Sequence, residues 1–362
     1  MGINMRTFLI AEAGVNHNGD LSLAKKLIDA AADVGADAVK FQTFRAEQVV
    51  SRHAPKAEYQ ARITGQFESQ LEMLRKLELS EADHGEMMAH AKARGIMFLS
   101  TPFDVPSLDF LTKQFGLQII KIPSGEITNA PFLLAIARAA KRVIVSTGMS
   151  TLAEVEAALS VLAFGFTSAA TVTPRREDFE QAFASDAGQQ ALRERVTVLH
   201  CTTEYPAPFS EVNLRAMDTL ATAFGLPVGY SDHTLGIHIA LAAVARGARV
   251  IEKHITLDRN LPGPDHKASL EPDELRELVC QIREIEQALG DGIKRPAASE
   301  WKNRNVARRS LVAARAIQAG EVFAAESLTC KRPGAGVSPF EYWEILGQAA
   351  SRSYNVDEAL DV

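Results

Sequence analysis

One sequence pattern constrains the fold more than any other: short β-rich runs recur along the chain, each ending in polar residues and followed by a helical pattern. Strands that alternate with helices form parallel sheets, because each helical crossover returns the chain to the same edge of the sheet. We identify eight candidate strands, the number that closes a (β/α)₈ barrel. They span 8–13, 38–44, 96–102, 118–126, 142–148, 196–203, 227–233 and 249–256.

The alternative to a barrel is an open, doubly wound sheet. Such a sheet usually carries a glycine-rich phosphate loop after its first strand, and neither GxGxxG nor GxxxxGK[ST] occurs here. The polar residues of this chain instead collect at the carboxyl ends of the candidate strands, where the catalytic residues of (β/α)₈ enzymes lie. We therefore predict an α/β fold with a TIM barrel and an active site at that rim.

The chain has two predicted domains. The barrel should occupy residues 1–290 and end in a long helix over 272–289, while 291–305 is rich in Gly, Pro, Ser and charges and is typical of a linker. Residues 306–362 contain short β-like pieces and turns, which predict a small β-rich domain. Within the barrel, the long segment 45–80 follows the second strand and is expected to form a lid or substrate wall.

Composition excludes several classes of function. With 46% hydrophobic residues, a net charge of −6 and no basic block, the 362-residue chain favours a soluble protein that does not bind nucleic acid. It has no apolar run long enough for a membrane span, and its N-terminus does not resemble a signal peptide. Its three cysteines, Cys201, Cys280 and Cys330, are widely spaced, which fits a reducing compartment. We expect a cytoplasmic protein.

Two lysines and three serines predict an anion site. Lys40 and Lys121 lie in apolar strands, where lysine is uncommon, and alternation directs both toward the mouth of the barrel. Ser124, Ser146 and Ser231 also stand at strand ends. Ammonium and hydroxyl groups together suit carboxylate and phosphate oxygens. Schiff-base chemistry on either lysine is the second interpretation.

Two histidines predict a metal site at the same rim. His233 and His254 end consecutive strands, and a parallel βαβ unit brings such ends side by side. Neutral imidazoles bind first-row transition ions and leave positions for water or substrate. Glu12 and Glu126 also lie at strand ends and could serve as a proton donor and a hydroxyl acceptor. Further candidate acids near the histidines are Asp232, Glu252 and Asp265.

Taken as an ordered set, the motifs resemble those of the sialic acid (nonulosonate) synthases over nearly the whole chain. The matching segments are AEAGVNHNG (11–19), VKFQTF (39–44), APKAEYQ (54–60), ESQLEML (68–74), STPFD (100–104), KIPSGE (121–126), STGM (146–149), HCTTEYPAPF (200–209), GYSDHT (229–234), IEKH (251–254), LPGPDHKASLEPDE (261–274) and KRPG (331–334). Any one of these motifs alone would indicate little.

The resemblance implies a (β/α)₈ barrel followed by a C-terminal SAF, or antifreeze-like, domain that caps the partner's barrel in a domain-swapped homodimer. It implies condensation of phosphoenolpyruvate with an N-acylated mannosamine-type sugar, with C–O cleavage and phosphate release. Phosphoenolpyruvate would contact Lys40, Lys121, Ser124, Ser146, Ser231 and Thr203. The sugar would contact Gln42, Tyr205, Asp265 and, from the partner chain, Arg332; the metal, Mn²⁺ or Mg²⁺, would be held by His233 and His254. Catalysis would involve Glu12, Glu126, Lys40 and Lys121.

The chain departs from the family pattern at a few positions. Thr202 and Thr203 stand where some members have an Asn, and Ala335 replaces a common Asn in the small domain. We expect N-acetylmannosamine as the acceptor sugar, as in an N-acetylneuraminate synthase. The alternatives are a 2,4-diacetamido-2,4,6-trideoxymannose acceptor, which gives N,N'-diacetyllegionaminate, a Schiff-base pyruvate aldolase, and a non-catalytic sugar-binding protein.

Overall fold

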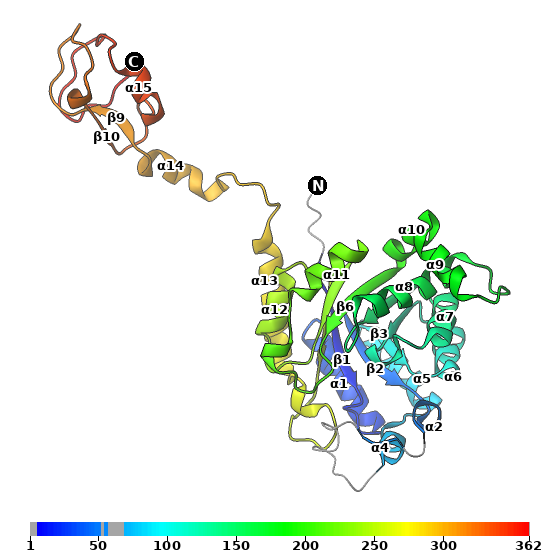
Figure 1. Ribbon diagram of the computed structural model, residues 1–362. Coiled ribbons are helices and arrows are strands. Elements are labelled where there is room, and N and C mark those ends of the chain that lie inside the picture. Colours follow the sequence, from blue (N-terminus) through cyan, green and yellow to red (C-terminus); the bar gives the residue numbers. More distant parts are fainter. Residues whose placement is uncertain (1–5, 52–53, 57–68, 362) are drawn as a thin grey trace. The chain divides into compact units, whose positions relative to one another are not determined.

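The computed structural model describes residues 6–51, 54–56 and 69–361 (Figure 1). Contacts divide the chain into two compact units, Met1–Asp291 and Gly292–Val362. The first unit contains an eight-stranded parallel sheet surrounded by helices, and the second contains a two-stranded antiparallel sheet.

The eight strands follow one another in the order expected for a (β/α)₈ barrel. Hydrogen-bonded neighbours run β3-β2-β1-β8-β7-β6-β5-β4, and every pair is parallel. The two end strands, β3 and β4, also have Cα atoms within 8 Å of each other, so the sheet curls into a barrel. The fold prediction is confirmed. The strands are β1 (Phe8–Gly14), β2 (Ala38–Thr43), β3 (Met97–Pro102), β4 (Ile119–Ile122), β5 (Arg142–Ser146), β6 (Val196–Cys201), β7 (Val228–Asp232) and β8 (Val250–His254).

Helices of the first unit connect the strands and cover them on the outside (Figure 1). None of the helices in the described part of the chain is long and apolar enough to cross a membrane. The helices are α1 (Leu21–Asp33), α2 (Ala46–Val49), α4 (Gln70–Leu77), α5 (Glu81–Ala93), α6 (Val105–Asp109), α7 (Ala130–Ala139), α8 (Leu152–Thr167), α9 (Arg176–Ala184), α10 (Asp186–Arg195), α11 (Ala216–Phe224), α12 (His238–Ala245) and α13 (Pro272–Leu289).

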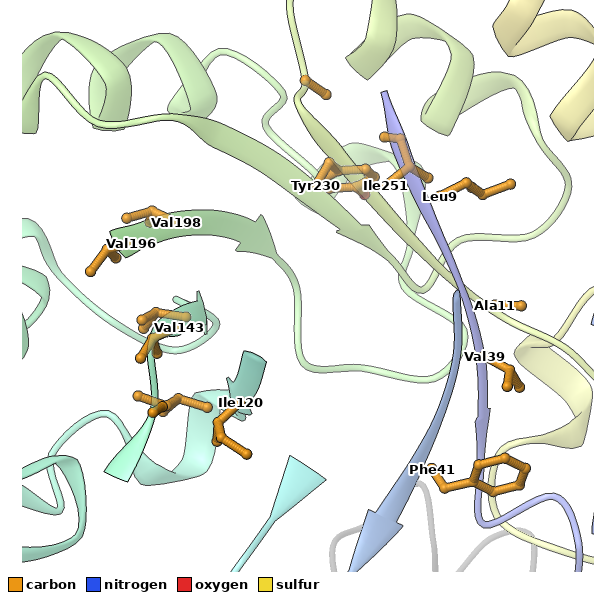
Figure 2. Packing of buried hydrophobic residues seen from close by; sticks show 14 of the residues in the cluster. Leu9, Ala11, Val39, Phe41, Ile120, Val143, Val196, Val198, Tyr230 and Ile251 are labelled. Carbon is orange, nitrogen blue, oxygen red and sulfur yellow. The ribbon is translucent and has the colours of Figure 1, made fainter. Parts of the chain in front are cut away.

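Side-chain alternation along the strands builds two separate apolar layers. One set of positions belongs to the large core shared with the helices, and Figure 2 shows some of these residues, including Leu9, Ala11 and Phe41. The alternate set forms a small buried cluster inside the barrel, made of Ile10, Ala38, Leu99, Ile144, Leu199 and Val250. Two residues further along, each of these strands places a polar or ionisable side chain on the same face: Glu12, Lys40, Thr101, Ser146, Cys201 and Glu252. The inner apolar cluster is thus the floor of a polar chamber.

The predicted lid, 45–80, is described in part. Helices α2 and α4 lie in this segment, and the buried side chains Met73 and Leu77 of α4 pack with Val15 and Phe44. Residues 52–53 and 57–68 lie outside the described residues, so the APKAEYQ motif is only partly covered. Helix α4 begins with a capping box in which Ser69 and Glu72 bond each other's backbone N–H groups.

The second unit has a small core of its own. Strands β9 (Ser310–Ala313) and β10 (Leu328–Lys331) pair antiparallel, and a short helix, α15 (Tyr342–Ile345), follows. The predicted linker, 291–305, differs from the expectation of irregular chain, because helix α14 (Trp301–Ala307) begins within it. The core contains Leu311, Ala313, Ile317, Phe323, Leu328, Ile345, Ala350, Tyr354 and Leu360.

Candidate active site

A pocket of about 360 Å³ opens where the barrel strands end. Strands, strand-following loops and the two lid helices all contribute to its wall. It brings together most of the side chains that the sequence predicts for the site, which are Glu12, Lys40, Gln42, Lys121, Ser124, Ser146, Thr203, Tyr205, Ser231, His233, His254 and Asp265.

Glu126 and Arg332 are not among the residues that line this pocket, and the role of Arg332, which was expected from the partner chain, stays a prediction. Glu126 ends the 3₁₀ turn Ser124–Glu126, and its carboxylate accepts a hydrogen bond of 2.7 Å from the Asn129 side chain. Arg332 follows β10 in the second unit and is exposed there.

Four buried ionisable groups form a network at the centre of the pocket. The Lys40 ammonium lies 2.6 Å from a carboxylate oxygen of Glu12 and 3.5 Å from one of Glu252. Lys121 lies 3.5 Å from the other Glu252 oxygen, which also accepts a 2.8 Å hydrogen bond from Ser231. Glu252 therefore joins the two lysines. All four charged side chains are at least 95% buried, so each depends on the others for the stabilisation that water would otherwise supply.

The pKa values of the two carboxylates in this network are shifted in opposite directions. Burial raises the pKa of Glu12 to about 7, although Lys40 acts against the shift. Burial also acts to raise the pKa of Glu252, but the charges of Lys121 and Lys40 outweigh it and hold that pKa well below its usual range. Burial acts to lower the pKa of Lys40, yet Glu12 and Glu252 raise it, whereas burial lowers the pKa of Lys121 despite Glu252. Glu12 is thus able to exchange a proton near neutral pH.

Hydroxyl groups and a close backbone turn form an anion cradle beside Lys121. The Gly148 N–H donates to Ser124 Oγ over 2.9 Å, and a Cβ at position 148 would lie 2.3 Å from Thr203 Oγ1. Glycine is needed here because any side chain would fill the space between the hydroxyls. Among the described residues, Ser146 Oγ and Thr203 Oγ1 are buried and make no hydrogen bond. Buried hydroxyls without a partner favour a polar ligand at this point.

A second set of polar side chains meets above Gly14, whose φ of 52° lies in the left-handed region. A Cβ on Gly14 would lie 3.3 Å from Glu12, 3.4 Å from Gln42 and 3.7 Å from Asp265. Gln42 also donates a 3.4 Å hydrogen bond to Glu12. Burial raises the pKa of Asp265 to about 6. This end of the pocket therefore offers an amide and two carboxyl groups that can hold protons near neutral pH.

The two predicted metal-binding histidines face each other across β7 and β8, with ring centroids 5.5 Å apart. His233 Nδ1 lies 2.6 Å from the Thr202 carbonyl oxygen, so this nitrogen carries a proton and Nε2 keeps the lone pair when the ring is neutral. His254 Nδ1 is buried, without a hydrogen bond among the described residues, and 3.8 Å from an Asp265 oxygen. Burial lowers the pKa of both rings, to about 4 for His233 and well below the usual value for His254.

These rings fit a divalent ion in their chemistry. Both are neutral at physiological pH, as metal ligands must be, and the carbonyl contact of His233 is the kind of outer bond that fixes a ligating ring. Within the described ranges no group of three or more His, Cys, Asp or Glu side chains is close enough to hold a metal by itself. The pair would therefore leave most coordination positions to oxygen atoms of water or substrate.

The structure places two further residues, Glu252 and Thr101, in contact with the lysines of the site. Glu252, one of several candidate acids in the sequence, is the residue that links Lys40 to Lys121. The signal was present: it stands two residues before His254 and pairs in register with Ser231. Thr101, which accepts a 3.1 Å hydrogen bond from Lys40, lies in the STPFD motif and was not among the predicted site residues.

Fold and site together define a class of protein: a (β/α)₈ barrel with buried lysines and hydroxyls suited to a small anion, beside a pair of neutral imidazoles. Comparison with known proteins gives the family. Residues 27–294 match the NeuB family and residues 308–360 match the SAF domain. The chain belongs to the NeuB family. It is a phosphoenolpyruvate-dependent enzyme that forms a C–C bond, of the sialic acid synthase type.

Relatives match over almost the full length. The N,N'-diacetyllegionaminic acid synthase of Campylobacter jejuni is 55% identical and covers 98% of this chain and 99% of its own. The enzyme of the same name from Legionella pneumophila is 46% identical, over 99% of this chain and 94% of its own. The crystal structure of N-acetylneuraminic acid synthetase from Leptospira borgpetersenii is 36% identical, with a TM-score of 0.67, over 83% of this chain and 90% of its own.

The raised pKa of Glu12 leads to a prediction about stability. Between pH 4.5 and about 7 the folded protein keeps a proton on Glu12 that the unfolded chain has lost, so Glu12 makes the free energy of unfolding fall as the pH rises. Glu12→Gln removes this term. The difference in unfolding free energy, variant minus wild type, should rise across this window by up to about 3 kcal/mol. Parallel curves between pH 5 and 8 would contradict the assignment.

Urea unfolding followed by far-UV circular dichroism is the suitable measurement, because both tryptophans, Trp301 and Trp343, lie in the second unit and would not report on the barrel. Glu252→Gln is the matched control. Its depressed pKa means that Glu252 stabilises the fold above pH 4.5 and loses this effect in acid. The stability deficit of Glu252→Gln relative to wild type should therefore shrink as the pH falls below 4.5. For Glu12→Gln, by contrast, the difference from wild type changes above pH 4.5 and increases as the pH rises.

Proposed function

We propose that the protein condenses phosphoenolpyruvate with 2,4-diacetamido-2,4,6-trideoxymannose to give N,N'-diacetyllegionaminic acid and phosphate. The main support is the order of identities: two enzymes named for this product are 55% and 46% identical, while the structure named for N-acetylneuraminic acid is 36% identical. The proposal replaces our sequence-based expectation of N-acetylmannosamine as the acceptor.

The pocket wall supports the same acceptor. Helices α2 and α4 contribute the apolar side chains Val49, Met73, Leu74 and Leu77. In the trideoxy sugar C6 is a methyl group, whereas in N-acetylmannosamine C6 is a hydroxymethyl group. An apolar wall therefore suits the trideoxy sugar better. The amide of Gln42 lies within the same pocket and can bond an acetamido group.

In the proposed mechanism, Lys40 and Lys121 bind the anionic groups of phosphoenolpyruvate together with the hydroxyls of the cradle. Its C3 carbon attacks the aldehyde carbon of the sugar, a C–C bond forms, and the aldehyde oxygen takes up a proton. Glu12 is suited to donate that proton, because burial keeps it protonated up to about pH 7 and it lines the pocket. Water then adds to the electron-deficient C2 and loses a proton. The C2–O bond to phosphate breaks as the new C2 hydroxyl becomes the ketone, so phosphate leaves with the bridging oxygen and the hydroxyl proton is released. Glu126 receives no step, since it does not line the pocket.

We further propose that His233 and His254 hold a divalent cation, Mn²⁺ or Mg²⁺. Bound there, the cation would supply Lewis-acid polarisation of the sugar carbonyl. The support is the pair of buried, neutral rings and the fixed tautomer of His233. The partner chain's SAF domain is proposed to cover this site and to direct Arg332 toward the sugar.

The acceptor can be identified by phosphate-release assays with purified protein, phosphoenolpyruvate and Mn²⁺. We expect kcat/KM for the diacetamido sugar to exceed that for N-acetylmannosamine by about 100-fold or more, because polar groups built to bond the second acetamido group would be left unpaired. The two sugars differ at C6 and in the second acetamido group. 2-Acetamido-2,6-dideoxymannose separates the effects of these two differences, since it has the C6 methyl but only one acetamido group. Higher efficiency with N-acetylmannosamine would refute the proposed acceptor.

The metal proposal predicts that EDTA abolishes turnover and that Mn²⁺ restores it in the wild type. His233→Ala should lose activity by about 10²-fold or more, without rescue, because one of two ligands is gone. His238→Ala is the matched control: this histidine is exposed at the start of α12. A Schiff-base aldolase would instead be insensitive to EDTA and would form a pyruvate adduct on Lys40 or Lys121 that borohydride traps; we expect no such adduct.

The action of Arg332 across a dimer predicts active-site complementation. Arg332→Ala and His233→Ala should each be inactive, whereas a mixed dimer would contain one intact site. Random reassociation should then restore roughly a quarter of wild-type activity, given half mixed dimers with one working site of two. Lys331→Ala, which removes a neighbouring charge paired with Asp357, is the control and should keep its activity. No recovery on mixing would place Arg332 in its own chain's site or outside it.

A further inference from the structure

The residues next to the two histidines form a second, separate contact. Asp232 precedes His233 at the end of β7, and Lys253 precedes His254 at the end of β8; the two are register partners. The Lys253 ammonium lies 2.9 Å from a carboxylate oxygen of Asp232, and both side chains are 0% exposed. Because neighbouring strand residues point to opposite faces, this ion pair lies on the outer face of the strands, while the histidines line the pocket inside.

The contact involves the residues on both sides of His233 in the sequence. Lys253 also donates a 2.6 Å hydrogen bond to the backbone carbonyl of Thr234, the residue after His233. The other oxygen of Asp232 accepts from both the N–H and the hydroxyl of Thr234, at 2.9 and 2.8 Å. One side chain of β8 therefore binds the chain of β7 immediately before and immediately after a pocket histidine.

The location of the contact matters because backbone pairing stops there. The β7–β8 register runs through Tyr230, Ser231 and Asp232 and ends at the Asp232–Lys253 pair. His233 and His254 stand one position beyond it. Backbone ladder bonds between the two strands thus do not fix the relative position of the rings. Side-chain bonds join the strands on both faces here: Ser231 bonds Glu252 over 2.8 Å on the pocket face and lies 3.3 Å from His233 Nε2, and the Asp232–Lys253–Thr234 contacts join the strands on the outer face.

We infer that Asp232 and Lys253 are positioning residues, which set the separation of His233 and His254 and so the affinity of the pocket for a divalent cation. The inference rests on the proposed metal site. Two ligands bind one ion well only when their lone pairs are held at a common point, and residues that orient ligands commonly change metal affinity by 10–100-fold when replaced. Neither residue touches the pocket, so their effect is exerted through the backbone.

The test measures cation binding rather than turnover. Mn²⁺ is titrated into the metal-free full-length protein, and free Mn²⁺ is followed by electron paramagnetic resonance. The main variant is the double substitution Asp232→Asn/Lys253→Met, which avoids leaving one buried charge unpaired. We expect its Kd for Mn²⁺ to increase about 10-fold or more. Thr234→Val, which keeps the Lys253 contact but loses the hydroxyl bond to Asp232, should show a smaller increase and serves if the double variant does not fold.

The matched control is Arg283→Met. Arg283 of α13 bonds Asp37 over 2.8 Å at the opposite ends of the strands, where Asp37 also accepts from the Leu9 N–H. Its loss should lower stability, measured by far-UV circular dichroism, while the Kd for Mn²⁺ stays within about twofold of wild type, because among the described residues its hydrogen bonds reach Thr7, Glu286 and Asp37 and not β7 or β8. A similar increase in Kd for this variant would mean that general destabilisation, not positioning, explains the result.

The outcomes separate the two proposals. If His233→Ala loses Mn²⁺ binding while the double variant and Thr234→Val bind as tightly as wild type, the positioning role is refuted and the metal site stands. If wild type and His233→Ala bind Mn²⁺ equally, or neither binds it, the metal site itself is refuted and the inference falls with it.

Discussion

The burial of four ionisable side chains at the centre of the barrel is the constraint on which the rest of the site depends. Lys40, Lys121, Glu12 and Glu252 lie almost out of contact with water, so whichever of them are ionised depend on their neighbours for stabilisation. The apolar floor below them excludes water from beneath, and the strands fix the positions from which they point inward. The opposed pKa shifts of the two carboxylates follow directly from this arrangement: Glu252 lies between two lysines, whereas Glu12 has only one close cation.

Much of this arrangement was predictable because it depends on alternation. Strands of a parallel barrel place every second residue inside, which predicted that Lys40 and Glu12 face the interior; the register that pairs Ile10 with Ala38, seen in the structure, brings them to one level. The eight strands were predicted from the repeated order of strand and helix patterns, and the proximity of His233 and His254 from the parallel βαβ connection between their strands. The residue types then indicated an anion site and a metal pair, and the ordered motifs indicated the family.

The remaining features depend on contacts between segments far apart in sequence. Glu126 ends an apolar strand pattern, but the chain turns after Ile122 and directs its carboxylate to Asn129 instead of the pocket. The sequence does not distinguish Glu252 from the other acids near the histidines, because its position between the two lysines depends on the packing of three strands. Helix α14 begins in a segment without apolar periodicity. The acceptor sugar depends on the fit of the pocket wall, which motifs common to several branches do not specify, and the identities to named relatives favour a different sugar from the one we expected.

The position of Glu252 has a consequence for selectivity among anions. Its two oxygens already occupy the space between the ammonium groups of Lys40 and Lys121, so the protein carries an internal competitor for every incoming anion. An anion is bound only if its contacts with the lysines and the cradle hydroxyls exceed those that it disturbs. A substrate with a carboxylate and a phosphate on a short carbon frame would offer one anionic group to each of the two lysines that Glu252 joins.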